Sequence, residues 1–154
     1  MMAVHKIIDD FYEDSFTLLA IHSSMEDYAI VYALNLCLKG NFKRSAEDLD
    51  ISDHISFPIF EWKDKANENY WTLITNNSLQ EDNLVRSDLF ENEPSFTKHH
   101  LVPEHKEADF LLKIEHDTSN LEKDTVKQLL AVPRIITAYV LDVDQLKSKN
   151  NLIF

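Results

Sequence analysis

Apolar and polar positions along the chain form short stretches with the spacing of strands and helices. The stretch "DSFTLLAIHS" (Asp14–Ser23) carries a continuous apolar run and predicts a buried β-strand. Residues 23–40 have apolar positions at helical spacing and predict a helix. One face of this helix consists of Met25, Tyr28, Ala29, Tyr32, Ala33, Leu36 and Cys37. Because Ile30, Val31 and Leu34 widen the apolar face, we expect the helix to be buried on two sides.

The two ends of this helix carry capping signals. Ser23 and Glu26 stand three residues apart, which predicts a capping box at the start. Gly40 follows Lys39 where a C-cap glycine belongs. Gly40 is also the only glycine of the chain, which excludes glycine-rich phosphate loops because these need several glycines.

The middle of the chain predicts strands that are interrupted by turns. Residues 41–51 predict a strand with irregular alternation, and residues 54–64 predict one around Pro58. Proline cannot donate to a strand ladder, so we expect an edge strand or a bulge there. Residues 65–69 predict a hairpin turn, and residues 70–79 predict the returning strand.

Residues 80–98 are polar and aperiodic, so they predict a long surface loop with a short helical turn at 84–90. Residues 108–117 then predict a strand, residues 119–133 a helix and residues 134–146 a further strand. Ser119 or Asn120 would cap this helix, and its buried face would be Leu121, Thr125, Leu129 and Val132.

The element order predicts the fold class. It runs β-α-β-β-β, loop, β-α-β, which favours an α+β fold with a mostly antiparallel sheet and two main helices. The two β-α-β-like parts suggest a ferredoxin-like arrangement with an inserted hairpin. We expect one domain over residues 1–154, since no linker divides the chain.

Charge limits the partners. The 27 acidic and 15 basic residues give a net charge of −12. Such a surface repels phosphate backbones and anionic lipids, so we expect neither nucleic acid nor membrane as a partner. The charge serves either solubility or docking to a basic protein partner.

Cysteine usage and the chain ends point to the cytoplasm. Cys37 is the only cysteine, so it cannot form an internal disulfide, and we interpret it as a small buried apolar residue. The N-terminal residues lack the pattern of a signal peptide, and no apolar run approaches the roughly 18 residues of a membrane span.

Catalytic and metal motifs are not visible in the sequence. His99, His100 and His105 gather around Pro103, but their spacing does not match a zinc motif, so we expect a solvated loop and neither metal nor cofactor. No nucleophile elbow is present, and no catalytic residue can be named.

Aromatic residues gather in the predicted hairpin. Phe57, Phe60, Trp62 and Trp71 lie there without interleaved basic residues, so they indicate core or an interface rather than a base-stacking platform. An exposed share of them would form a dimer or partner surface.

The stretch "VPEHKEADF" (Val102–Phe110) resembles the signature of the IPExxxVDY family of Bacteroidota. Pro103, Glu104 and Asp109 match the signature, and Phe110 stands for its tyrosine. The segments "FPIFEW" and "KSKNNLIF" are also similar to the family, so the resemblance covers essentially the whole chain. It implies a small cytoplasmic protein and supplies no catalytic residues, because the family is uncharacterised.

The acids of this motif have two interpretations. Glu104 and Asp109 either bond backbone amides of a turn, or they bind a partner. Pro103 fixes its own φ and disfavours helix at Val102, so the motif predicts a turn that leads into a strand.

Three function classes follow. The first is a non-enzymatic protein-interaction module that acts as a homodimer. The alternative is an ACT-like regulatory domain for an amino acid or nucleotide, since residues 111–142 have its strand, helix, strand rhythm; the turn "IHSSMED" lacks the glycine usual there. A hydrolase-type enzyme that uses histidines and carboxylates ranks third.

Overall fold

The main sheet has six strands in the order β10-β1-β9-β6-β5-β2, and every neighbouring pair is antiparallel. The structure is a computed structural model, and it describes residues 16–52, 55–81, 96–115 and 121–152. The strands of this sheet are β1 (Phe16–Ser23), β2 (Lys43–Arg44), β5 (Ile59–Asp64), β6 (Asn69–Thr75), β9 (Phe110–Glu115) and β10 (Ile135–Leu141). Two smaller sheets pair β3 (Leu49–Ser52) with β4 (Ile55–Phe57), and β7 (Asn77–Glu81) with β8 (Phe96–His100).

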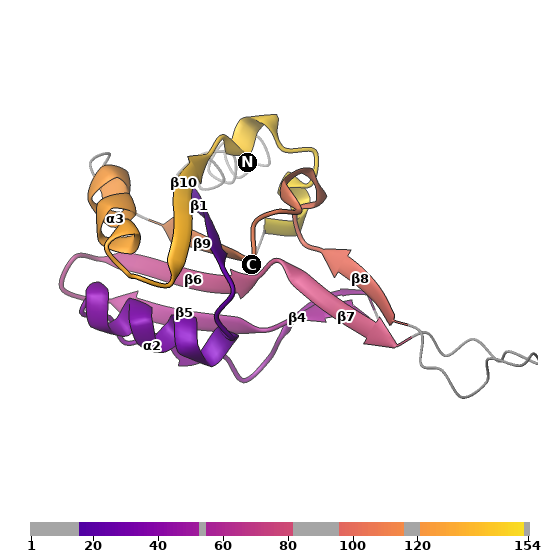
Figure 1. Cartoon of the computed structure of the whole chain (residues 1–154), viewed down its shortest axis with the longest axis horizontal. Coiled ribbons are helices and arrows are strands. Elements are labelled where there is room, and N and C mark those ends of the chain that lie inside the picture. The colour runs from indigo at the N-terminus through magenta and orange to yellow at the C-terminus, as the bar shows by residue number, and fades with distance from the viewer. Residues whose placement is uncertain (1–15, 53–54, 82–95, 116–120, 153–154) are drawn as a thin grey trace, which may run out of the picture.

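The two faces of the main sheet have different covers. Helices α2 (Asp27–Cys37) and α3 (Leu121–Leu130) cover one face, which we call the helix face (Figure 1). The opposite face, which we call the turn face, is covered by segments around three short 3₁₀ helices. These are η1 (Pro103–His105), η2 (Val143–Gln145) and η3 (Lys149–Leu152).

Four strands and the two helices form a ferredoxin-like core. Its strands run β10-β1-β9-β6 in space, with α2 after β1 and α3 after β9. Strand β5 extends the core through a hairpin with β6, and β2 forms the far edge. The predicted α+β class and mostly antiparallel sheet are therefore confirmed.

Strand β1 lies at the centre of the core and is buried on both faces. Leu19 and Ile21 pack on the helix face, whereas Leu18 and Ala20 pack on the turn face. This explains why its sequence is a continuous apolar run rather than an alternation of apolar and polar residues. The prediction of a buried strand at this place is confirmed.

The middle of the chain is more divided than the sequence predicted. Pro58 separates β4 from β5, which belong to different sheets, because proline has no amide to continue the ladder. Residues 41–51 form parts of two short strands, β2 and β3, instead of one. The hairpin turn at 65–69 is present, with Glu68 in the left-handed region at φ 55°.

The predicted returning strand and long loop also need correction. Asn76 interrupts residues 70–79, so that β6 stays in the main sheet and β7 leaves it toward β8 (Figure 1). Of the predicted loop 80–98, residues 80–81 belong to β7 and residues 96–98 belong to β8. The rest of that prediction, including the helical turn at 84–90, lies outside the described residues.

Helix α2 begins and ends differently from the prediction. Its N-cap is Glu26, which makes no side-chain capping bond, and Ser23 is the last residue of β1. The hydroxyl of Ser23 instead donates to the carbonyl of Arg134 at 2.9 Å. The same hydroxyl accepts from the amide of Met25 at 3.2 Å. The capping box is therefore absent, because the helix begins at Asp27 and Ser23 lies three residues before its N-cap.

At the C-terminus of α2, the left-handed residue is Lys39, at φ 53°, and not Gly40. The amide of Gly40 donates to the carbonyl of Asn35 at 3.1 Å, as in a Schellman ending. Gly40 is required for another reason, since a Cβ there would lie 3.0 Å from Cε3 of Trp62. The glycine thus allows close packing against Trp62, while Lys39 adopts the left-handed backbone conformation, which is strained for a residue with a side chain.

Helix α3 forms where residues 119–133 predicted it, but it ends at Leu130, so Val132 lies in the turn that follows. Thr125 and Leu129 are buried and Val132 is partly buried, as expected for one apolar face. The predicted caps Ser119 and Asn120 lie outside the described residues.

Candidate functional site

Helix α2 presents an exposed apolar stripe to solvent. Tyr28 is 71% exposed, Tyr32 68% and Leu36 64%. These residues are four positions apart, so they lie on one side of the helix. The opposite side packs Ile30, Val31 and Leu34 into the core. Among the described residues, only one side of α2 has a protein layer against it, so they do not bury the helix on two sides as predicted.

This stripe borders a groove of about 930 Å³, which we call the α2 groove. Its other wall is the turn between α3 and β10, residues 131–134. Ala29, Ala33 and Cys37 form part of its lining. Burial raises the pKa of the Cys37 thiol, so the thiol stays protonated at neutral pH and acts as an apolar surface.

The α2 groove is also unusual in its charge. Residues 28–38 contain no charged side chain, although charged residues make up 27% of the chain. Glu26 and Asp27 lie before this run and Lys39 follows it. An exposed helix of a monomer ordinarily carries charges on its outer face, so this surface resembles a protein-binding face.

A second cavity, of about 500 Å³, is polar. It lies where the β1–α2 turn meets the junction of β6 and β7 and the start of β9. Its polar lining residues are Ser23, Ser24, Glu26, Asp27, Asp48, Ser56, Thr75, Asn77, Ser78 and Asp109. The lining contains four carboxylates and no basic side chain, so the cavity would repel phosphate groups and attract cations.

The two acids of the family-like motif bind distant parts of the chain. The Glu104 carboxylate accepts from the amide of Ser148 at 3.1 Å and from its hydroxyl at 2.9 Å. Asp109 accepts from the amide of Ser23 at 2.8 Å. Both carboxylates therefore receive backbone amide bonds, from segments 44 and 86 residues away in the sequence.

The environment of Glu104 favours its charged form. Partial desolvation acts to raise its pKa, but hydrogen bonds from the amide and hydroxyl of Ser148 outweigh this effect. The pKa of Glu104 therefore lies below its ordinary value. The carboxylate acts as a structural acceptor at neutral pH rather than as a proton donor.

The other motif residues complete a turn that is anchored to the sheet. Pro103 is exposed at the start of η1, and Phe110 is buried in the core of the helix face. The side chain of Asn76 bonds to the backbone of this turn: its Nδ2 donates to the carbonyls of His105 and Ala108, both at 2.9 Å. Its Oδ1 accepts from the amide of Val102 at 2.8 Å.

The C-terminal segment is tied to the turn face by further polar contacts. Lys113 is buried, and its Nζ donates to the carbonyl of Leu152 at 2.7 Å. Asn151 donates to the carbonyl of Leu101 at 3.0 Å. Burial lowers the pKa of Lys113, and nearby Glu115 partly offsets that effect. The side chain of Leu152 is buried among these contacts.

The predicted aromatic interface does not form at the surface. Phe57, Phe60 and Trp71 are buried in the core, and Trp62 is half-buried against it. Trp62 stacks on Trp71 with ring centroids 5.0 Å apart. Phe60, Trp62 and Trp71 lie in the core of the helix face, whereas Phe57 lies in the core of the turn face, so of the two interpretations the rings agree with core.

Of the three histidines predicted to lie in a solvated loop around Pro103, two belong to a strand. His99 and His100 end β8, opposite Ser78 and Asn77 of β7, while His105 closes η1. Among the described residues, no three His, Cys, Asp or Glu side chains form a group that could hold a metal ion.

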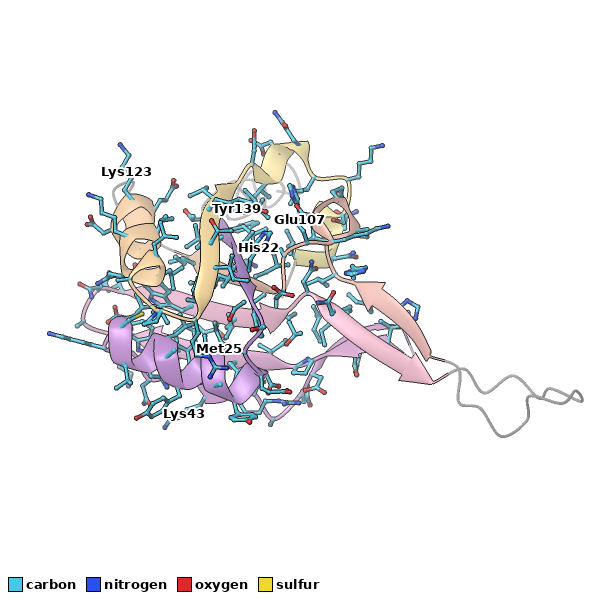
Figure 2. All side chains as sticks on the ribbon, viewed as in Figure 1. His22, Met25, Lys43, Glu107, Lys123 and Tyr139 are labelled. Carbon is cyan, nitrogen blue, oxygen red and sulfur yellow. The ribbon has the colours of Figure 1, made fainter. Side chains whose placement is uncertain are left out.

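One chain of titratable groups does form near the β10 edge. His22 and Tyr139 lie 2.9 Å apart, between Nε2 and Oη, and Glu107 lies 3.5 Å from the same hydroxyl (Figure 2). Burial and the nearby Glu107 carboxylate raise the pKa of Tyr139. The side chain of Glu107 is exposed, so water screens its charge. The three side chains therefore form a hydrogen-bonded network at the protein surface.

Two important features escaped prediction from the sequence. Asn76 gives no local signal, because its three partners lie 26 to 32 residues away. The exposed stripe of α2 did have a signal, namely a helix that is apolar on nearly all sides. That pattern predicted burial, whereas the chain itself supplies cover on one side only.

Comparisons with known proteins name no relative. No family model matches the chain, and no curated protein matches it. The resemblance to the IPExxxVDY family therefore stays a prediction. Among the described residues, no helix is long and apolar enough to cross a membrane.

Proposed function

We propose that this protein is a non-enzymatic protein-interaction module whose binding surface is the α2 groove. The observation that carries the proposal is the uncharged, exposed stripe of Tyr28, Tyr32 and Leu36 in a strongly acidic chain. An apolar surface of this kind gains free energy when a partner removes it from water.

The partner that fits best is an apolar helix or segment with basic flanking residues. The groove runs along one helix and would receive apolar anchors at helical spacing. Tyrosines are common anchors in such contacts, because they bury a large ring at little entropic cost. The net charge of −12 and the acids at Glu26 and Asp27 favour basic residues beside those anchors. We place this function in the cytoplasm.

Comparative affinity capture tests the proposal. The wild-type protein, Tyr32→Glu and Gln128→Glu would be used as baits against extract from the native cell. Gln128 lies exposed on α3, so its variant adds the same charge away from the groove. We expect partners that bind the wild type and Gln128→Glu but not Tyr32→Glu.

A captured partner must then bind as a purified protein. We expect calorimetric titration to give at least tenfold weaker binding for Tyr32→Glu and unchanged binding for Gln128→Glu. Equal binding to all three proteins would contradict a role for the groove. Thermal unfolding of each bait checks that the exposed substitutions leave the fold intact.

The polar cavity favours a second candidate, a regulatory domain for a small ligand. Its four carboxylates and its hydroxyl groups suit a cationic amine better than a nucleotide. Thermal-shift measurements with lysine, arginine and glutamate distinguish the classes. This candidate requires stabilisation by a basic amino acid and none by glutamate, and the absence of any shift would remove it.

A further inference from the structure

The outer edge of β10 is open for strand pairing. Strand β1 pairs with one side of β10, and among the described residues no strand pairs with the other. Edge strands of monomers are ordinarily blunted by charges, proline, bulges or short length, and β10 has an irregularity of this kind only at its start, between Ile135 and Thr137. The seven residues of β10, "IITAYVL", include neither a charged residue nor proline.

The opposite edge of the same sheet shows the contrast. Strand β2 has only two residues, Lys43 and Arg44, and both are charged and exposed. This edge has the protection that monomeric sheets usually have. The sheet therefore blocks one edge and leaves the other available.

Apolar side chains also stand out along the available edge. Ile136 is 74% exposed and Val140 is 43% exposed. Val140 lies two residues from Ala138 in the regular part of the strand, so both face the helix side of the sheet. At the start of β10 the register with β1 shifts, and Ile136 has no facing residue on β1.

The sequence of this edge is complementary to itself. When two identical strands pair antiparallel around a twofold axis, residues that stand opposite each other have side chains on the same face of the sheet. Side chains of one strand share a face at every second position, so the two opposing residue numbers differ by an even number and have an even sum. A twofold axis at Ala138 places Ile136 opposite Val140 of a second copy. Arg134 in the turn before β10 and Asp142 directly after it are both exposed in the single chain, so antiparallel pairing brings one basic and one acidic residue to each end of the paired strands.

Neighbouring registers lose these matches. An axis one residue earlier places Arg134 opposite Val140, and an axis one residue later places Ile136 opposite Asp142. Apolar and charged side chains would then face each other at both ends. Only the axis at Ala138 pairs the apolar residues together and the opposite charges together.

We propose that two copies of the chain pair antiparallel along β10, with the twofold axis at Ala138, and form one continuous sheet. The partner is a second copy because antiparallel pairing brings the basic residue before one strand to the acidic residue after the other, and it covers the exposed apolar residues of both. The residues of β10 are not part of the α2 stripe, so this proposal does not rest on the proposed function, although Arg134 also lines the α2 groove. It assigns the homodimer to β10 instead of the aromatic hairpin.

Register-specific crosslinking tests the pairing. In a Cys37→Ser background, Ile136→Cys and Val140→Cys would be combined in one chain and oxidised. In the proposed register these positions face each other within about 5.5 Å between Cα atoms, which is within disulfide reach. We expect the double variant to form a covalent dimer on a reducible gel.

Each single cysteine variant is the matched control. In the same register, Ile136 and its own copy are four residues apart along the strands, about 13 Å, which exceeds the disulfide limit of about 7 Å. We expect the single variants to remain uncrosslinked. Crosslinking of the single variants to the same extent, or none in the double variant, overturns the register.

Oligomeric state provides a second measurement. Sedimentation of the wild-type protein over a concentration series, in about 0.15 M salt to screen the acidic charge, should show a dimer. Ile136→Lys should weaken the dimer at least tenfold, whereas Leu130→Lys, at an exposed apolar residue outside the strand, should not. A wild-type monomer at all concentrations overturns the proposal.

The two proposals fail separately. Tyr32→Glu should lose the groove partner and keep the dimer, whereas Ile136→Lys should do the reverse. Loss of the dimer in Tyr32→Glu with retention in Ile136→Lys would assign self-association to α2 and overturn the pairing through β10.

Discussion

The helix face and the turn face of the main sheet are covered in different ways. On the helix face, regular helices satisfy most of their own backbone groups and pack apolar side chains against the sheet. On the turn face, irregular backbone lies against the sheet, and polar side chains such as Asn76, Glu104 and Lys113 satisfy its groups. The first cover depends on apolar packing, and the second also depends on specific hydrogen bonds.

The two faces also differ in what their side chains are available for. The helix face carries the exposed α2 stripe, where regular secondary structure leaves apolar side chains free for a partner. The turn face uses the conspicuous polar residues of the sequence to hold its own segments together. The residues that look most like a functional motif are therefore engaged within the chain.

Removal of the Asn76 side chain should have the largest effect on stability. Asn76→Ala leaves the carbonyls of His105 and Ala108 and the amide of Val102 without their partner. We expect a loss of about 4 kcal/mol in the free energy of unfolding, because buried unpaired groups cost about 1–3 kcal/mol each. Urea denaturation measures it.

Asn77 provides the neighbouring control. Its Oδ1 has no hydrogen-bond partner among the described residues, so Asn77→Ala should change the free energy of unfolding by less than about 1 kcal/mol. Equal losses at both positions would show that the turn face does not depend on the Asn76 bonds.

Truncation of Leu152 should have the next largest effect. This leucine is buried on the turn face, although it lies within a short 3₁₀ helix near the C-terminus. We expect Leu152→Ala to cost about 3 kcal/mol, as for other buried leucines. The exposed Leu36 on α2 is the control, and Leu36→Ala should cost less than about 0.5 kcal/mol. A similar loss for both would contradict the difference in burial.

The turn after α2 allows two opposite substitutions on the helix face. Gly40→Ala should destabilise the protein by about 2 kcal/mol, because the new Cβ would press on Trp62. Lys39→Gly should stabilise it by about 1 kcal/mol, since glycine accepts the left-handed backbone without strain. Thermal unfolding that shifts downward for the first and upward for the second supports both assignments.

The smallest expected effect concerns Glu104 and pH. Its pKa is lowered in the folded state, so its charge contributes stability above the ordinary value of 4.5. That contribution is lost as pH falls through the lower folded-state pKa. Glu104→Gln should therefore reduce stability at pH 7 and should lose less than the wild type on acidification to pH 3. Denaturation at several pH values checks this, and parallel pH profiles would contradict it.

Local patterns were sufficient to predict several elements. The continuous apolar run of β1 and the apolar face of α3 correctly indicated a buried strand and a one-sided helix. Pro58 predicted an edge strand or a bulge, whereas it separates two strands, of which β5 pairs on both sides. These features depend on residues within one or two turns, which is why local sequence reveals them.

Long-range partners decided the remaining features. The roles of Asn76, Glu104 and Lys113 depend on segments 26 to 44 residues away, and no local pattern names such partners. The exposure of α2 likewise depends on what the rest of the chain covers. The sequence by itself determined the fold class and the apolar character of α2. Only the tertiary structure decided which side of α2 is covered and which edge of the sheet stays open, because burial belongs to the packed molecule and not to a residue.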